Sequence, residues 1–158
     1  MKVRFHALPG IVKVGISLYT PMEANNWSDI VWVQGKSNLN AEASWIRAND
    51  EYFDSVGTRV VMGRGFADTD TQNSPTVAVV NQSFVKKFFG KENPIGHHFG
   101  TRGPGSAADC EIIGVVEDTV YTSVRWRDHY MVRRCHRVAS RAPHERFGKK
   151  CATDARGN

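Results

Sequence analysis

The sequence predicts an α+β domain, in which a mixed β-sheet carries a few short helices. Short stretches of apolar or alternating apolar and polar residues recur along the chain at strand length. Two brief segments place their apolar residues at helical spacing instead. Glycine, proline and asparagine separate these pieces, and strands and helices mix along the chain.

The predicted strands differ in how they are buried. The stretch IVKVGISLY (11–19) alternates apolar and polar residues, as a strand with one buried face does. The stretch CEIIGVVEDTVY (110–121) has a continuous apolar centre, and we expect it to be the last strand. PIGHHFG (94–100) is expected to be extended, and a loop rich in glycine and proline follows it. The remaining predicted strands cover residues 30–36, 43–49 and 76–81, and residues 58–66 are expected to form a strand and then a turn.

Two short helices are expected, each with a recognisable start and stop. Asn49 or Asp50 is the predicted N-cap of the first, and Gly57 is its predicted stop. Asn81 is the predicted N-cap of the second, which ends at Gly90. Their apolar faces consist of Tyr52, Phe53 and Val56 in the first helix and Phe84, Val85, Phe88 and Phe89 in the second.

Charge divides the chain into two parts. The net charge of +5 is uneven, because residues 1–124 hold 11 Lys and Arg against 13 Asp and Glu, a net of −2. Residues 125–158 hold 10 against 3, a net of +7, with no Leu or Ile. We therefore predict a body at 1–124 and a basic tail at 125–158 that is disordered or read out of frame, or is a gene remnant.

The polar residues of the body do not form a catalytic or cofactor pattern. No glycine lies between Val77 and Phe89, so the strand–helix junction lacks the backbone approach that a phosphate loop needs. His97 and His98 are adjacent on an extended segment and point to opposite faces, which disfavours a shared metal. Glu117 and Asp118 diverge for the same reason. We expect no catalytic residue, cofactor or metal, and the body is predicted not to be an enzyme.

Structural roles are expected instead for the remaining polar and aromatic residues. Arg64 is predicted to pair with Asp68 or Asp70, and Phe66 is predicted to pack inward. Glu117 and Asp118 are expected at a solvated strand end.

The tail leaves two alternatives open. Cys135 and Cys151 are 16 residues apart and lack the close pair of a zinc knuckle, so a metal-dependent function is poorly supported. A small basic nucleic-acid-binding protein acting through residues 125–158 is the rival function. Few aromatic residues accompany its arginines, and no nucleic-acid-binding motif is present.

Several motifs, taken in order, resemble the MacB-like periplasmic core domain of ABC-transporter permeases. The family shows V-x-x-x-YF-x-x-x-G, G-R-x-F-x-x-x-D, V-x-V-V-N, P-I-G and V-G-V-V-x-D. These correspond here to Tyr52, Phe53 and Gly57; Gly63, Arg64, Phe66 and Asp70; Val77, Val79, Val80 and Asn81; Pro94, Ile95 and Gly96; and Gly114, Val115, Val116 and Asp118. The likeness is greatest to large bacterial permeases that lack a fused ATPase.

The resemblance implies a non-catalytic domain on the extracytoplasmic face of the bacterial cytoplasmic membrane, lying between two transmembrane helices of an export permease. Its implied role is partner contact and mechanical coupling. The implied partners are other permease segments, a separate ATPase subunit and a periplasmic adaptor. Compared with the family, the chain looks truncated at both ends, and its own sequence shows no signal peptide and no apolar run of membrane-spanning length. Membrane association is therefore expected only through the missing helices, and no nucleic acid is expected as a partner.

One segment is the candidate for partner contact. TPMEANNWSD (20–29) is rich in turn-forming residues and is expected to be a loop. Met22 and Trp27 are apolar residues within it, and exposed apolar residues in a polar loop often mark an interaction site.

Overall fold

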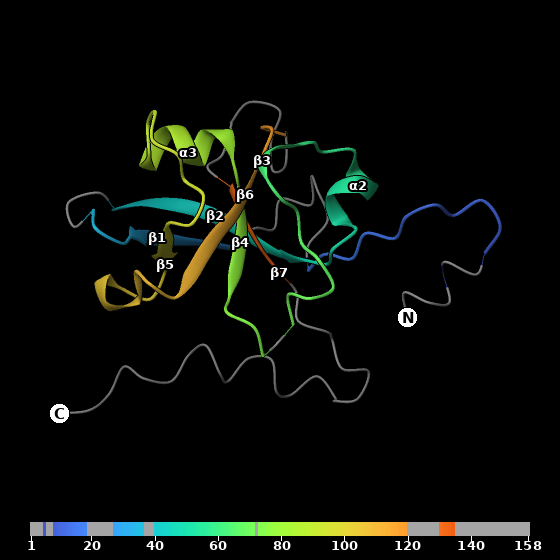
Figure 1. Cartoon of the computed structure of the whole chain (residues 1–158), viewed down its shortest axis with the longest axis horizontal. Coiled ribbons are helices and arrows are strands. Elements are labelled where there is room, and N and C mark those ends of the chain that lie inside the picture. The colour runs from blue at the N-terminus through green and yellow to red at the C-terminus, as the bar shows by residue number, and fades with distance from the viewer. Residues whose placement is uncertain are drawn as a thin grey trace.

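A computed structural model describes residues 5, 8–18, 27–36, 40–71, 73–119 and 130–134 (Figure 1). In chain order its elements are β1 (Trp27–Val33), β2 (Asn40–Ala48), α2 (Tyr52–Val56), β3 (Val60–Gly63), β4 (Val77–Asn81), α3 (Gln82–Phe88), β5 (His98–Gly100), the 3₁₀ turn η1 (Pro104–Ser106), β6 (Cys110–Val116) and β7 (Tyr130–Arg134). The predicted α+β class with a mixed sheet and short helices is confirmed.

The seven strands form one mixed sheet in the order β3-β6-β4-β7-β2-β1-β5, with a further pairing between β5 and β6. Because of that pairing the sheet closes on itself. Strands β2 and β7 pair in parallel, as do β4 and β6, and the other pairs are antiparallel. Strands β5 and β3 both pair with β6, each along a different part of it. Strand β5 pairs with Cys110 and Glu111, and β3 pairs with Gly114 to Val116.

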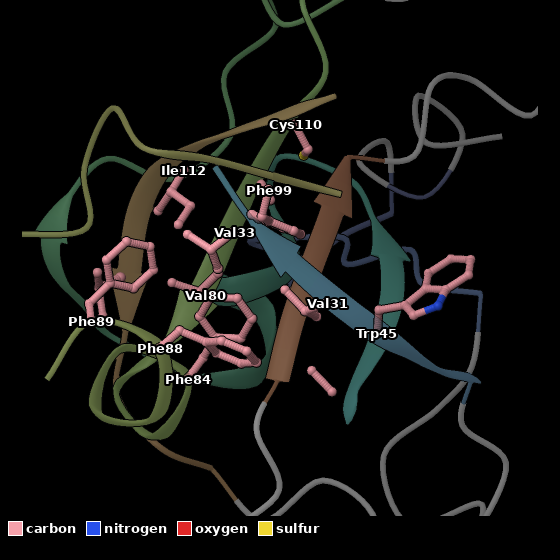
Figure 2. Close-up of a cluster of buried hydrophobic side chains, with 13 residues drawn as sticks. Val31, Val33, Trp45, Val80, Phe84, Phe88, Phe89, Phe99, Cys110 and Ile112 are labelled. Atoms are coloured by element: carbon pink, nitrogen blue, oxygen red, sulfur yellow. The ribbon is translucent and has the colours of Figure 1, made fainter. Parts of the chain in front are cut away.

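Two apolar clusters pack against opposite faces of the central strands. Ala78 and Val80 of β4 belong to one cluster, whereas Val77 and Val79 belong to the other. This alternation follows from the two-residue period of a strand and explains why β4 is apolar throughout. Figure 2 shows the first cluster, in which residues of helix α3 pack beneath Val80. The rings of Phe84 and Phe88 are 4.5 Å apart there.

The N-terminal segment is less regular than predicted. Of the strand expected at 11–19, the described residues 11–18 form a single bridge, between Ser17 and Ala48. Asn49 holds the segment with its side chain, accepting from the Ile16 backbone N–H at 2.8 Å and donating to the Val14 carbonyl at 2.9 Å.

The prediction that Asn49 or Asp50 caps helix α2 was wrong. The N-cap position falls at Glu51, whose side chain makes no capping hydrogen bond.

Strand β7 was not predicted from the sequence. The expectation that 110–121 is the last strand was wrong, because residues 130–134 pair along β2 in parallel and along β4 antiparallel. This strand lies past the boundary expected near residue 124. A run of tyrosine, methionine, valine and two arginines carries no alternation that would have marked it as a central strand. The disorder or out-of-frame origin expected for the rest of the tail falls on residues outside the described part.

Candidate functional site

Two of the sequence motifs meet at the start of helix α3. The Asn81 side chain accepts from the Phe84 backbone N–H at 3.0 Å, which confirms it as the N-cap. Asp118 lies beside it and accepts from the Asn81 amide at 2.7 Å, the Ser83 backbone N–H at 2.8 Å and the Ser83 hydroxyl at 2.7 Å. A carboxylate at this place also suits the positive end of the helix. These hydrogen bonds link the end of β6 to the start of α3, and they give the polar groups of Asn81, Ser83 and Asp118 partners within the protein.

Arg64 and Asp70 form the predicted ion pair of the G-R-x-F-x-x-x-D motif. The guanidinium donates two parallel hydrogen bonds of 2.8 Å to the two Asp70 oxygens. Asp70 is buried and also accepts from the Ala67 backbone N–H at 2.8 Å. The hydrogen bond to Asp70, helped by the nearby carboxylate charges, raises the pKa of Arg64. Phe66 is buried, as predicted, and its ring stacks 5.8 Å from that of Phe53.

Gly63 and Gly114 allow β3 and β6 to approach closely. Gly63 has a φ of +69°, and a Cβ placed on it would lie 2.3 Å from the Ile113 carbonyl oxygen. A Cβ on Gly114 would lie 2.0 Å from the Arg64 carbonyl oxygen. Neither position has room for a side chain, so both glycines of the motifs serve strand packing.

The paired histidines make separate contacts. His97 sits after the turn that Pro94 begins, with its ring edge-on to Phe89 at 5.3 Å and its Nε2 3.4 Å from a Glu92 oxygen. His98 opens β5 and pairs with Glu111 through the backbone. Within the described ranges no three His, Cys, Asp or Glu side chains gather as metal ligands would. The absence of a metal or cofactor site stays a prediction for the whole chain.

Glu117 and Asp118 turn to different neighbours, as predicted for adjacent strand-end residues. Glu117 accepts from the Arg59 backbone N–H at 3.0 Å and from its guanidinium at 2.9 Å and 3.1 Å. These hydrogen bonds, the backbone one first, lower the pKa of Glu117. Asp118 instead binds the start of α3, so it is more engaged than the solvated strand end that the sequence suggested.

The predicted partner-contact loop is only partly described. Met22 lies outside the described residues, and so do the other residues at 19–26. The expected loop at 20–29 was too long, because Trp27 already begins β1, where its backbone pairs with that of Trp45. The structure therefore does not bring Met22 and Trp27 into one described site.

Sequence reasoning missed an exposed apolar edge and the pocket beside it. Val60, Val61 and Met62 of β3 were read as an ordinary strand, yet they are 39%, 46% and 46% exposed. An open pocket of about 520 Å³ begins where β3 ends and is lined by Arg64 and Ile113 among others. Only the topology reveals these features, because a short apolar run does not tell an edge strand from a central one.

No helix in the described part of the chain is both long and apolar enough to cross a membrane.

Comparison with known proteins gives a consistent family. The sequence profile of the MacB-like periplasmic core domain matches residues 7–137. The macrolide export ATP-binding/permease protein MacB 2 of Aeromonas hydrophila is 31% identical over 83 residues, which are 51% of this chain and 12% of that protein. The chain thus corresponds to a small part of this relative's length.

Solved structures show the same fold. The periplasmic region of MacB from Actinobacillus actinomycetemcomitans superposes with a TM-score of 0.61 at 22% identity, covering 84% of this chain and 52% of that one. The extracellular domain of the noncanonic ABC-type transporter YknZ from Gram-positive bacteria gives 0.58 at 18% identity, covering 84% and 59%. The profile match spans most of the chain and reaches past β7. The chain therefore belongs to the MacB-like periplasmic core domain family, the periplasmic domains of ABC-type transporter permeases.

Proposed function

We propose that this chain is a non-catalytic extracytoplasmic part of an ABC-type export permease, where it serves partner contact and mechanical coupling. The observation that carries the proposal is the family match over residues 7–137, which includes β7. Other permease segments, a separate ATPase subunit and a periplasmic adaptor are the proposed partners. The domain joins the membrane through transmembrane segments of the parent permease.

The way the polar motif residues are used supports a structural role. Asn81 and Asp118 satisfy the start of α3, and Arg64 and Asp70 satisfy each other. A nucleophile or general base must be able to reach a substrate, whereas these side chains are held in hydrogen bonds with other groups of the protein. The sheet closes on itself and carries two buried apolar clusters, an arrangement that suits a domain that transmits movement.

The nucleic-acid alternative gains no support from these findings. Strand β7 places part of the basic segment within the sheet, and the family match continues through residue 137. The nucleic-acid alternative would be supported if the chain bound DNA with an affinity that falls steeply with salt and is lost when the tail is deleted.

The loop at 20–29 is the proposed contact surface, with Met22 and Trp27 as its apolar residues. The test replaces Trp27 with serine in the membrane-embedded parent permease. We expect less co-purification of the partner and less export, while the ATPase subunit still hydrolyses ATP. Ile30→Ser is the matched control, because Ile30 is a 52% exposed apolar residue of the same strand. Unchanged partner binding and export in Trp27→Ser would exclude this surface.

A further inference from the structure

The outer edge of β3 presents a run of exposed apolar side chains. Strand β3 ends the strand order and pairs only with β6 within the described part of the chain. All four of its residues are exposed, and three of them in succession are apolar. An edge strand offers backbone N–H and C=O groups to another strand, and proteins usually protect such edges with charge or cover. Here the edge carries apolar side chains at Val60, Val61 and Met62.

The pocket continues this edge. Gly63 and Arg64, at the end of β3, form part of its lining. Val77, Ile95 and Ile113 supply apolar lining. A strand added along β3 would extend past Gly63 toward the pocket. Strand addition gains affinity from backbone hydrogen bonds and specificity from pockets that receive side chains, and both parts are present here.

The charged residues that line the pocket indicate which kind of side chain would bind in it. Arg64 is neutralised by Asp70, with which it shares two hydrogen bonds. Glu111 also lines the pocket, and its carboxylate makes no hydrogen bond or close ion pair with a described residue, although its charge acts on the nearby Arg64 guanidinium. One positive and two negative groups leave the pocket with one excess negative charge. A lysine or arginine side chain fits this arrangement, because its aliphatic stem covers apolar lining and its charged end reaches the carboxylate.

We propose that β3 and the adjoining pocket bind an extended segment of another polypeptide, in which a basic residue accompanies apolar residues. The segment adds to β3 as a further strand and places the basic side chain beside Glu111. The proposal rests on the proposed function, because it gives a surface and a chemical class for a partner of this domain.

A second copy of this chain is a poorer occupant of the edge. Its own β3 is flanked by Arg59 and Arg64, but both guanidinium groups are already bound. Arg59 is paired with Glu117, and Arg64 is paired with Asp70. Two β3 edges brought together would therefore bring no further basic group to either Glu111 carboxylate, whose charge already acts on the Arg64 guanidinium that Asp70 binds.

The experiment measures binding of short labelled peptides to the purified full chain by fluorescence anisotropy. The probe is a capped peptide in which valine alternates with threonine and one central valine is replaced by lysine. We expect saturable binding, weakened about three- to fivefold when the lysine becomes glutamate, in line with a partly exposed ion pair. A proline at the peptide centre is expected to abolish binding, because it removes a backbone donor.

Two variants locate the site. Glu111→Gln is expected to remove the preference for lysine over glutamate while the neutral valine–threonine peptide binds as before. Met62→Lys, which adds a protective charge to the edge, is expected to weaken the lysine peptide about tenfold. Ile30→Lys is the control, since Ile30 is 52% exposed on β1, away from the edge strand, and it is expected to leave binding unchanged.

The outcomes are distinct. Circular dichroism first establishes that each variant is folded, and Glu111→Gln provides the test if Met62→Lys is not. No saturable binding by the folded chain, or binding that neither variant alters, overturns the proposal. A dimer in sedimentation that Met62→Lys dissociates would assign the edge to a second copy and also overturn it. None of these results bears on whether the domain belongs to a permease, so failure here stays separate from failure of the proposed function.

Discussion

Polar residues of the family motifs complete backbone hydrogen bonding in the described part of the chain. Asn81 and Asp118 come from different motifs, yet together they receive two backbone N–H groups of the first turn of α3. Such groups would otherwise lie unpaired at a partly buried helix start. Asn81 could be predicted as a cap from its place between an apolar strand and a helical face. Its meeting with Asp118, 37 residues further on, could not, because sequence does not reveal that β4 and β6 are neighbours.

Removing the cap should be measurable. We predict that Asn81→Ala lowers the free energy of unfolding by about 1–2 kcal/mol, because the Phe84 N–H and the Asp118 carboxylate each lose a hydrogen bond. Urea unfolding followed by circular dichroism gives the value. Gln82→Ala is the control, since Gln82 is exposed in the same helix and should change stability by less than about 0.5 kcal/mol. Equal effects of the two substitutions would contradict the capping role.

Glu117 should contribute to the acid sensitivity of the fold. Hydrogen bonds from Arg59 lower its pKa in the folded chain, so the folded state binds fewer protons than the unfolded state. The stabilisation is present above the unfolded pKa of about 4.3 and is lost as pH falls through the lower folded value. We predict that Glu117→Gln flattens the fall of unfolding free energy below about pH 4.5. Urea unfolding at a series of pH values tests this, and parallel curves would refute it.

At the scale of elements, burial explains which strands the sequence revealed. Strand β4 is buried on both faces and reads as a continuous apolar run, so its position was predicted within a residue. The segment at 11–19 has the alternation of a strand, but most of it makes no ladder. Its backbone is held by the side chains of Asn49 and Glu51 together with two backbone hydrogen bonds that flank the bridge. The spacing of apolar residues indicates which side chains face the core. It does not indicate whether another strand lies beside the segment to pair with it.

The contact between β3 and β6 depends on the absence of a side chain. We predict that Gly114→Ala lowers the free energy of unfolding by about 1–3 kcal/mol, because its Cβ would meet the Arg64 carbonyl and move the backbone. Thermal unfolding is the measurement. Gly105→Ala is the matched control, since a Cβ there meets nothing within 4 Å. Similar melting temperatures for the two variants would show that the close approach is not required.

At the scale of the molecule, part of the basic segment at 125–158 forms a strand of the sheet, which was not expected from the sequence. The alternation and the apolar residues that mark the other strands are weak at 130–134, so this strand was placed in the tail. The structure instead inserts it between β2 and β4, where it completes the closed sheet. A central strand can have modest sequence signals when its neighbours supply the pairing on both sides. The fold class and family could thus be predicted from the motifs, whereas closure of the sheet could not.

Truncation tests the role of β7 in the whole fold. A chain ending at residue 124 lacks β7, which leaves the facing edges of β2 and β4 without their partner. We predict that it loses cooperative thermal unfolding and associates through the open edges. A chain ending at residue 137 keeps β7 and should unfold like the full chain. Size-exclusion chromatography and calorimetry compare them, and equal behaviour of the two truncations would show that β7 is dispensable.

The central claim is that this domain lies outside the cytoplasmic membrane as part of a permease, and thiol labelling tests it most directly. In the parent protein Cys135 and Cys151 are replaced by serine and Lys86 by cysteine, because Lys86 is exposed on α3 whereas Cys110 is fully buried. A membrane-impermeant maleimide is added to spheroplasts before and after lysis. Full labelling at residue 86 is expected before lysis, and none is expected in a control that keeps only Cys110. Labelling at residue 86 that appears only after lysis would contradict it.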